Sequence, residues 1–151
     1  MINNLLLIDD DYDSLYISKR MFKKVGFANH IITLSNGKQG IEYFGKLAVG
    51  TEQMVPELIF SDSNMPVMNG LEFVEEYTCR FADRFPFVKI CLVSALIHPD
   101  YRAKALTYSS VIEVVEKPIR QIDLDGLKAL DGLRQHFDGI IKNSVLPPPL
   151  R

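Results

Sequence analysis

The chain has 151 residues, of which 47% are hydrophobic and 24% are charged. This balance is typical of a folded globular protein, and the length suits one domain. The net charge is -2, and no long run of one sign suggests direct binding to nucleic acid. No stretch approaches the roughly 20 apolar residues of a membrane span, and the first residues do not resemble a secretory signal. We therefore expect a cytoplasmic protein that contacts neither nucleic acid nor membrane.

Short apolar runs alternate along the chain with longer segments of helical period. This alternation predicts strand and helix units around a parallel sheet that is covered on both faces, in an α/β protein. The five expected strands are residues 5–9, 30–34, 58–62, 88–94 and 111–115.

The apolar spacing also predicts five helices, one after each strand. Asp11 or Asp13 is expected to cap the first helix. The second and third follow Asn36 and Gly70, and a weaker fourth spans about 99–108. The fifth has apolar residues at helical spacing, which are Leu124, Leu127, Leu130, Leu133 and Phe137.

Aspartates stand at the ends of two expected strands. Asp9 and Asp10 end the first strand, and Asp62 ends the third. The carboxyl ends of parallel strands share one edge of an open sheet, where such folds bind ligands, so these acids should converge. Clustered carboxylates repel one another unless a cation or a proton is present, and oxygen ligands suit Mg²⁺. The alternative for Asp9 and Asp10 alone is that they cap the first helix.

Two further polar residues end strands at the same edge. Lys117 precedes Pro118 after the last strand, and Ser94 ends the fourth. A cis Lys117–Pro118 bond would turn the ammonium group toward the crevice, where it could meet a phosphate. The Ser94 hydroxyl could bind the same ligand. Each residue also has a structural interpretation, as an exposed lysine before a turn and as a serine that caps the next turn.

Four segments together resemble the receiver domain of two-component response regulators. They are LLLIDDD from Leu5, LIFSDSNMPVMNGLEF from Leu58, VSA from Val93 and EKPI from Glu116. The resemblance covers about residues 4–141. It implies a flavodoxin-like (βα)5 fold of three layers, with a parallel five-stranded sheet of order 2-1-3-4-5. The receiver domain is expected at 1–142, and residues 143–151 are expected to form a flexible, proline-rich tail.

The resemblance also implies a role for each candidate residue. Asp62 matches the phosphoacceptor, and Lys117 matches the lysine that pairs with the phosphoryl group. Ser94 matches the hydroxyl residue that reorients toward the phosphoryl oxygens. The residues that match the Mg²⁺ site, for which Mn²⁺ is an alternative ion, are Asp9, Asp10, Asp62 and, through its main-chain carbonyl, Asn64.

On this resemblance the chain is a stand-alone signalling protein and not an enzyme, beyond its own phosphorylation and dephosphorylation. A sensor histidine kinase or a phosphotransfer protein would supply the phosphoryl group. An unknown downstream protein would contact the fourth helix, fifth strand and fifth helix. One alternative is a pseudo-receiver that binds partners without phosphorylation. The other is an aspartate-nucleophile phosphohydrolase, which generally needs an acid where this chain has Asn64.

Two positions near the candidate site distinguish this chain. The family usually has Tyr or Phe three residues before the lysine, whereas this chain has Val114. A small, stiff valine cannot rotate as a ring does, so we expect movement at Ser94 without an aromatic relay. Leu96 lies where related proteins control water access to the acyl phosphate. Its apolar side chain should slow hydrolysis.

Overall fold

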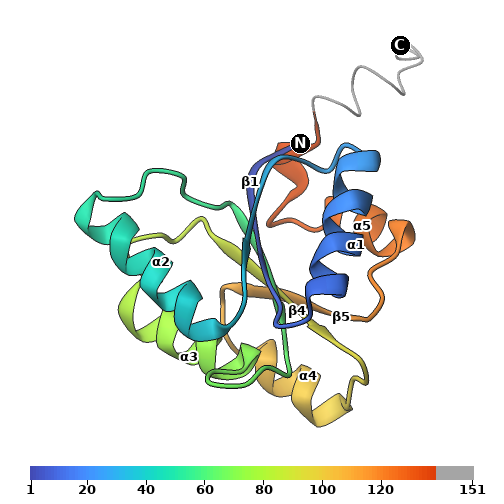
Figure 1. Ribbon diagram of the computed structural model, residues 1–151. Helices are drawn as coiled ribbons and strands as arrows, with labels where there is room; N and C mark the ends of the chain where they lie inside the picture. Colours follow the sequence, from blue (N-terminus) through green and yellow to red (C-terminus); the bar gives the residue numbers. More distant parts are fainter. Residues whose placement is uncertain (139–151) are drawn as a thin grey trace.

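The computed structural model describes residues 1–138, which form a parallel five-stranded sheet with helices on both faces (Figure 1). The strands lie in the order β2-β1-β3-β4-β5, and each neighbouring pair is parallel. Their bounds are β1 Ile2–Ile8, β2 Ala28–Leu34, β3 Leu58–Asp62, β4 Lys89–Ser94 and β5 Val111–Glu116. The expected α/β fold and strand order are therefore confirmed.

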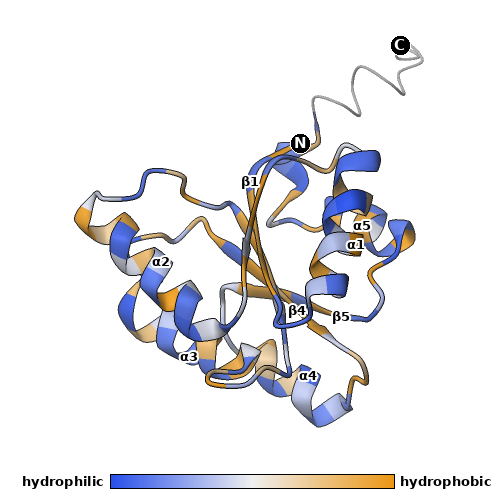
Figure 2. Ribbon diagram, viewed as in Figure 1, coloured by the Kyte–Doolittle hydropathy of each residue, from blue (hydrophilic) through white to orange (hydrophobic). Residues whose placement is uncertain are grey.

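Helices cover the sheet in two layers. α1 (Tyr12–Lys24) and α5 (Gln121–Lys128) pack on one face. α2 (Gly37–Val49), α3 (Gly70–Arg80) and α4 (Pro99–Ala105) pack on the other. Figure 2 shows apolar strands in the middle and hydrophilic residues on the outer sides of the helices. This arrangement is the three-layer sandwich that the sequence predicts.

The central strands are buried from both sides, which explains their continuous apolar runs. In β1, Leu6 and Ile8 belong to the core on one face of the sheet, and Leu5 and Leu7 belong to the core on the other. This division follows from the alternation of side chains along a strand. All five residues of β3 are buried, and the last of them is Asp62. The fold thus places a carboxylate at the buried end of a central strand.

The fifth helix is shorter than its apolar spacing predicts, so the expectation of one helix reaching Phe137 is wrong. α5 ends at Lys128, and a 3₁₀ helix follows at Arg134–His136. Leu133 and Phe137 are nevertheless buried, and the centroid of the Phe137 ring lies 5.3 Å from that of Phe27. Glycines in this segment weaken a continuous helix. Packing against the core therefore decides the path of the chain after Lys128. The apolar spacing identifies which residues are buried, but it does not show where the helix ends.

Several other boundaries differ from the sequence prediction, most of all the start of β1 and the end of α4. β1 begins at Ile2 rather than at Leu5, because Ile2 pairs with Ala28 of β2. α4 ends at Ala105, short of the expected Tyr108. Strand pairing and helix ends of this kind depend on neighbours that are distant in sequence, so local patterns locate them poorly.

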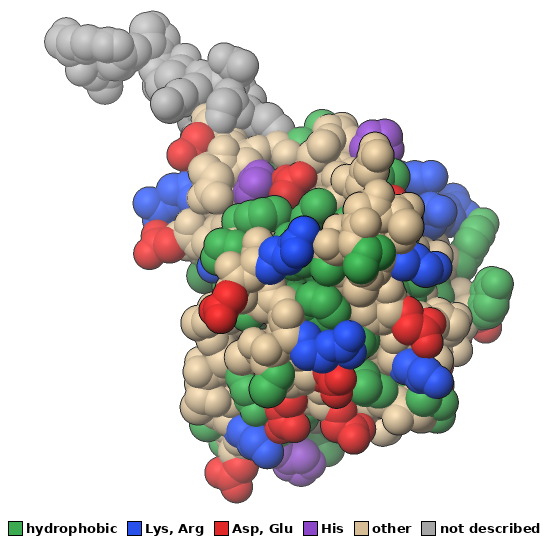
Figure 3. Space-filling view, turned by 90° about the vertical axis from the view of Figure 1, so that its left-hand side faces the viewer, with side chains coloured by type: hydrophobic (Ala, Val, Ile, Leu, Met, Phe, Trp, Pro, Cys, Tyr) green, Lys and Arg blue, Asp and Glu red, His purple; other side chains and the backbone are tan. Residues whose placement is uncertain are grey.

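Residues 139–142 of the expected domain and the expected tail, residues 143–151, lie outside the described residues. Within residues 1–138, no helix has both the length and the apolar character needed to cross a bilayer. On the face of the molecule in Figure 3, the described Lys and Arg side chains are interspersed with Asp and Glu and gather into no extended basic patch.

Gly70, the first residue of α3, lets this helix approach the end of β3 closely. A Cβ atom added at Gly70 would lie 2.5 Å from the carbonyl oxygen of Asp62 and 3.0 Å from the Cα atom of Ser63. Both neighbours are backbone atoms, which cannot rotate away. The lack of a side chain at this position therefore helps to fix the backbone that carries Asp62.

We predict that Gly70→Ala lowers the free energy of unfolding by about 1 to 3 kcal/mol, because the added methyl group forces the backbone apart. The matched control is Gly45→Ala in α2, where an added Cβ has no heavy atom within 4 Å. That control should gain up to about 1 kcal/mol from the higher helix propensity of alanine. Urea unfolding followed by circular dichroism measures both, and equal stabilities for the two variants would contradict the close approach.

Candidate functional site

Acidic side chains from two strand ends meet at the carboxyl edge of the sheet. Asp9 and Asp10 follow β1, and Asp62 ends β3. One carboxylate oxygen of each residue lies within 4.8 Å of the others. Asp9 and Asp62 are 9% and 7% exposed, whereas Asp10 is exposed. The expected convergence of the three acids is therefore present, and two of the acids are largely removed from water.

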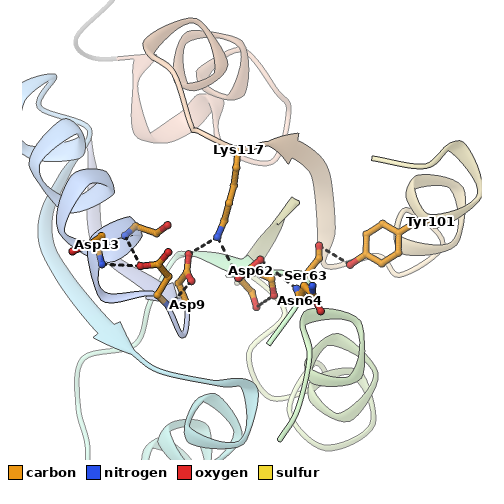
Figure 4. Close-up of polar contacts among 10 residues, drawn as sticks. Asp9, Asp13, Asp62, Ser63, Asn64, Tyr101 and Lys117 are labelled. Carbon is orange, nitrogen blue, oxygen red and sulfur yellow. Dashed lines mark hydrogen bonds and ion pairs between the residues drawn. The ribbon is translucent and has the colours of Figure 1, made fainter. Parts of the chain in front are cut away.

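Lys117 points into this acidic cluster from the end of β5 (Figure 4). Its Nζ atom lies 2.8 Å from Oδ2 of Asp9 and 3.2 Å from Oδ2 of Asp62. The Lys117–Pro118 peptide bond is cis, as the sequence suggested. The backbone N–H of Lys117 donates to the carbonyl of Ser94 at 2.8 Å. The lysine is thus anchored to β4 while its ammonium group joins two carboxylates.

The backbone holds the remaining carboxylate oxygens. The N–H of Asp11 donates to Oδ1 of Asp9 at 2.9 Å, and the N–H of Asn64 donates to Oδ1 of Asp62 at 3.2 Å. Asp62 and Asp9 are therefore each fixed by one backbone donor and by Lys117. Such fixed carboxylates are oriented before any ligand arrives.

Burial and neighbouring charges shift the pKa values of this group. Burial raises the pKa of Asp62 and the charge of Asp9 raises it further, although the Asn64 N–H and Lys117 oppose this, and the net direction is upward. Burial disfavours the charged form of Lys117, but its hydrogen bonds and charge interactions with Asp9 and Asp62 outweigh that effect and raise its pKa. One ammonium group therefore does not neutralise three carboxylates, and the site keeps an excess of negative charge.

The donor set at this edge fits a hard divalent cation. The side-chain donors of the cluster are all carboxylate oxygens from Asp9, Asp10 and Asp62. Mg²⁺ and Mn²⁺ prefer oxygen ligands, and Mg²⁺ typically takes one or two carboxylates and keeps several waters. The excess negative charge and the oxygen ligands both favour a divalent cation, so the residues suit the Mg²⁺ or Mn²⁺ ion that the sequence predicts.

The helix-capping alternative applies to a different aspartate. Asp11 caps α1, because its Oδ1 accepts from the backbone N–H groups of Asp13 at 2.9 Å and Ser14 at 3.3 Å. Asp9 and Asp10 are thus not the cap of this helix. Their carboxylates therefore remain available to bind a ligand in the cluster.

Ser94 does not join the acidic cluster in this structure. Its hydroxyl donates to the carbonyl of Leu96 at 3.0 Å, within its own loop. The side chain of Leu96 is 65% exposed, and Val114 on β5 is buried. Of the sequence-predicted site residues, Asp9, Asp10, Asp62 and Lys117 are brought together, Asn64 contributes its N–H, and Ser94 remains apart.

Sequence reasoning missed one polar contact beside the cluster. The phenol of Tyr101 on α4 donates to the hydroxyl of Ser63 at 2.7 Å, and Ser63 directly follows Asp62 (Figure 4). The two residues are 38 positions apart and belong to no shared local pattern. Only the folded chain places them together.

One family model matches most of the chain. The family model described as response regulator receiver domain matches residues 5–129. No curated protein matches the chain. A two-component response regulator from Cytophaga hutchinsonii is 26% identical, with a TM-score of 0.75, over 83% of this chain and 93% of that chain.

Two solved structures of lower identity share the fold. A chemotaxis response regulator of Vibrio cholerae is 21% identical with a TM-score of 0.63, over 84% of this chain and 96% of that one. The signal receiver domain of a signal transduction histidine kinase from Syntrophus aciditrophicus is 16% identical with a TM-score of 0.66, over 98% of both chains. The similar chains thus include a receiver that is part of a kinase.

We predict that Asp62→Asn stabilises the metal-free protein at pH 7 by about 1 kcal/mol, because it removes a charge that is buried and that Asp9 repels. Since the pKa of Asp62 is raised by folding, the native state binds more protons than the unfolded state just above the unfolded pKa. The free energy of unfolding of the wild type should therefore fall as pH rises through that window. In Asp62→Asn this contribution to the pH dependence should be absent. Denaturant unfolding at several pH values measures it.

Added Mg²⁺ should stabilise the wild type more than Asp62→Asn and so offset the advantage of the variant. At a tenfold excess over its dissociation constant it should stabilise the wild type by about 1.4 kcal/mol, and Asp62→Asn by less. The control is Asp83→Asn, on the exposed turn after α3, which should respond to Mg²⁺ as the wild type does. An equal response of wild type and Asp62→Asn would contradict the role of this carboxylate.

Proposed function

We propose that this chain, which belongs to the response regulator receiver domain family, accepts a phosphoryl group on Asp62 in a Mg²⁺-dependent reaction. A histidine kinase or a phosphotransfer protein would be the donor, since receiver domains interact with such proteins. The observation that carries the proposal is the arrangement of Asp62: a buried carboxylate at a strand end, held by Lys117 and flanked by Asp9 and Asp10.

Asp62 has the surroundings of a phosphoacceptor. Its Oδ1 accepts from Asn64 and its Oδ2 contacts Lys117, so the carboxylate is held in one orientation. In the proposed reaction one oxygen of Asp62 attacks the phosphorus of a phosphohistidine. An O–P bond forms, the N–P bond breaks, and the imidazole leaves with the electron pair of that bond. The product is an acyl phosphate.

Lys117 and the metal site would neutralise the transferred group. Phosphoryl transfer depends mainly on positioning and on stabilising the charge of the equatorial oxygens. Lys117 already bridges Asp9 and Asp62, so its ammonium lies where a phosphoryl group on Asp62 would need a cation. Mg²⁺ held by Asp9, Asp10, Asp62 and the main-chain carbonyl of Asn64 would supply further positive charge.

Ser94 would respond to the phosphoryl group after it has formed. The group adds about 1.5 to 2 negative charges at the strand end. The Ser94 hydroxyl now donates to the carbonyl of Leu96, and we propose that it exchanges this acceptor for a phosphoryl oxygen. A loop that gains such a partner shifts toward the conformer that makes the contact. That shift would reach the downstream protein through α4, β5 and α5.

The competing functions have less support. A pseudo-receiver would keep the fold without the chemistry, yet Asp9, Asp10, Asp62 and Lys117 are all present and in contact range. The family consists of signalling phosphoacceptors rather than metabolic enzymes, and this chain has Asn64 where a phosphohydrolase generally needs an acid. The stand-alone form and the cytoplasmic location stay predictions.

We expect that incubation with acetyl phosphate and Mg²⁺ adds the mass of one phosphoryl group to the wild type and none to Asp62→Ala, as measured by intact mass spectrometry. Asp83→Ala, which changes an exposed carboxylate on the turn after α3, is the matched control and should label as the wild type does. Absence of labelling would favour the pseudo-receiver. Many turnovers of a small phosphorylated metabolite would favour the hydrolase.

We also expect Leu96→Glu to shorten the lifetime of the acyl phosphate several-fold, because a polar side chain at this exposed position would admit and orient water. Loss of the label after removal of acetyl phosphate gives the rate. Ile122→Glu, at a similarly exposed apolar residue on α5, is the control for an added charge. If Leu96→Glu and the wild type lost the label at the same rate, Leu96 would have no part in dephosphorylation.

A further inference from the structure

The attachment of α4 to the rest of the domain rests on few interactions. It is the shortest of the five α-helices within residues 1–138, with seven residues, and His98 at its amino end makes no side-chain capping bond. Ala105 is the only buried residue of the helix. Its ion pairs, Arg102 with Glu113 and Lys104 with Glu75, join side chains that are between 30% and 61% exposed. Exposed pairs contribute little, so the position of α4 is sensitive to any further contact.

Tyr101 provides such a contact, and its partner lies next to the candidate site. The side chain is partly buried, and its phenol donates to the Ser63 hydroxyl at 2.7 Å (Figure 4). Among the described residues of α4, Tyr101 is the one whose side chain bonds to the loop between β3 and α3. The ion pairs of the helix instead join it to Glu113 on β5 and to Glu75 on α3.

The backbone of Ser63 is held more firmly than α4. Its N–H donates to the carbonyl of Val93 on β4 at 2.8 Å, and its carbonyl accepts from the N–H of Gly70 at 3.2 Å. The backbone of Ser63 is thereby tied to β4 and to the start of α3. Because Ser63 also follows Asp62 directly, the Tyr101 bond joins the short helix α4 to the immediate neighbour of the acidic cluster.

The phenol also experiences the charge at the strand end. Burial raises the pKa of Tyr101, the bond to Ser63 opposes this, and the negative charge of Asp62 raises the pKa further. The phenol proton is directed toward Ser63, on the side of the strand end. The phenol is already protonated at neutral pH, so a more negative group on Asp62 would act by attracting the positive end of its O–H dipole, which favours the present donating orientation.

We propose that the Tyr101–Ser63 hydrogen bond is a latch that couples the phosphorylation of Asp62 to the docking of α4. This inference rests on the proposed function, since it needs the phosphoryl group to form. The added negative charge strengthens the latch, and α4 then opens less often. Tyr101 acts through Ser63, so it is a positioning residue. Val114, buried and apolar on β5, offers no hydroxyl or ring for the same purpose.

The test is hydrogen exchange of the backbone amides of α4 with and without Mg²⁺ and beryllofluoride, a mimic of the phosphoryl group. In the wild type we expect the mimic to slow exchange in α4 several-fold. Tyr101→Phe and Ser63→Ala should each remove most of this slowing, and the double variant should remove no more than either. Measuring the change on adding the mimic separates coupling from a merely structural loss, which would alter exchange equally in both states.

Tyr108→Phe is the matched control. The Tyr108 phenol follows α4 and donates to Oε1 of Glu75 on α3 at 3.1 Å, away from the acidic cluster. This variant loses the same hydroxyl group and should keep the full slowing. A Tyr101→Phe protein that also keeps it, or additive effects of the two latch variants, would overturn the latch.

The proposed function is checked in the same preparations by labelling with acetyl phosphate. If the wild type gains a phosphoryl group and binds beryllofluoride but α4 exchanges at an unchanged rate, the latch fails and the proposed function stands. If the wild type neither gains the group nor binds beryllofluoride, both are overturned.

Discussion

Like charges held close together at the buried end of a sheet dominate this structure. Two of the three carboxylates in the cluster are largely buried, and only the ammonium group of Lys117 lies between them. Such an arrangement is unfavourable in isolation, and the pKa of Asp62 is raised by its burial and, to a smaller extent, by the charge of Asp9. The fold tolerates it because backbone donors from Asp11 and Asn64 hold the carboxylates in place. On the proposed function, this loss of stability is what would allow a cation and a phosphoryl group to bind.

The parts of the fold around the cluster serve this arrangement. β3 is buried along its length and ends in Asp62, and α3 approaches its end closely at Gly70. The cis bond before Pro118 accompanies the inward course of the Lys117 side chain. By contrast α4, on the side of Ser63, is short and lightly held. A rigid site beside a weakly attached helix is the combination that a switch needs, since charge changes at the first can alter the second.

The sequence predicts the acidic cluster well because its residues are marked by local patterns. Asp9, Asp10 and Asp62 end apolar runs, and the rule for parallel sheets then brings them together. Lys117 is found in the same way, from its place after the last strand and before a proline. Once the strands are recognised, little further information is needed to predict that these side chains meet. The family resemblance then suggests a chemical role for each of them.

The features that the sequence did not predict depend on long-range packing. The end of α5 at Lys128 is decided by how Leu133 and Phe137 reach the core. The Ser94 hydroxyl donates to a carbonyl of its own loop, and its position at the end of a strand does not predict this partner. The Tyr101–Ser63 bond spans 38 positions and requires the placement of α4. Periodicity identifies buried residues in such cases but not the partners of polar groups.

We infer that Asp9 and Asp62 carry uncompensated negative charge that a divalent cation would neutralise. A titration with Mg²⁺ followed by the NMR signals of the backbone amides tests it directly, because the amides of Asp11 and Asn64 donate to these two carboxylates. Both signals should shift along one saturable curve in the wild type, and saturation should require far more Mg²⁺ in Asp62→Asn. Signals that fail to saturate in the wild type, or that saturate at the same concentration in both proteins, would contradict the account.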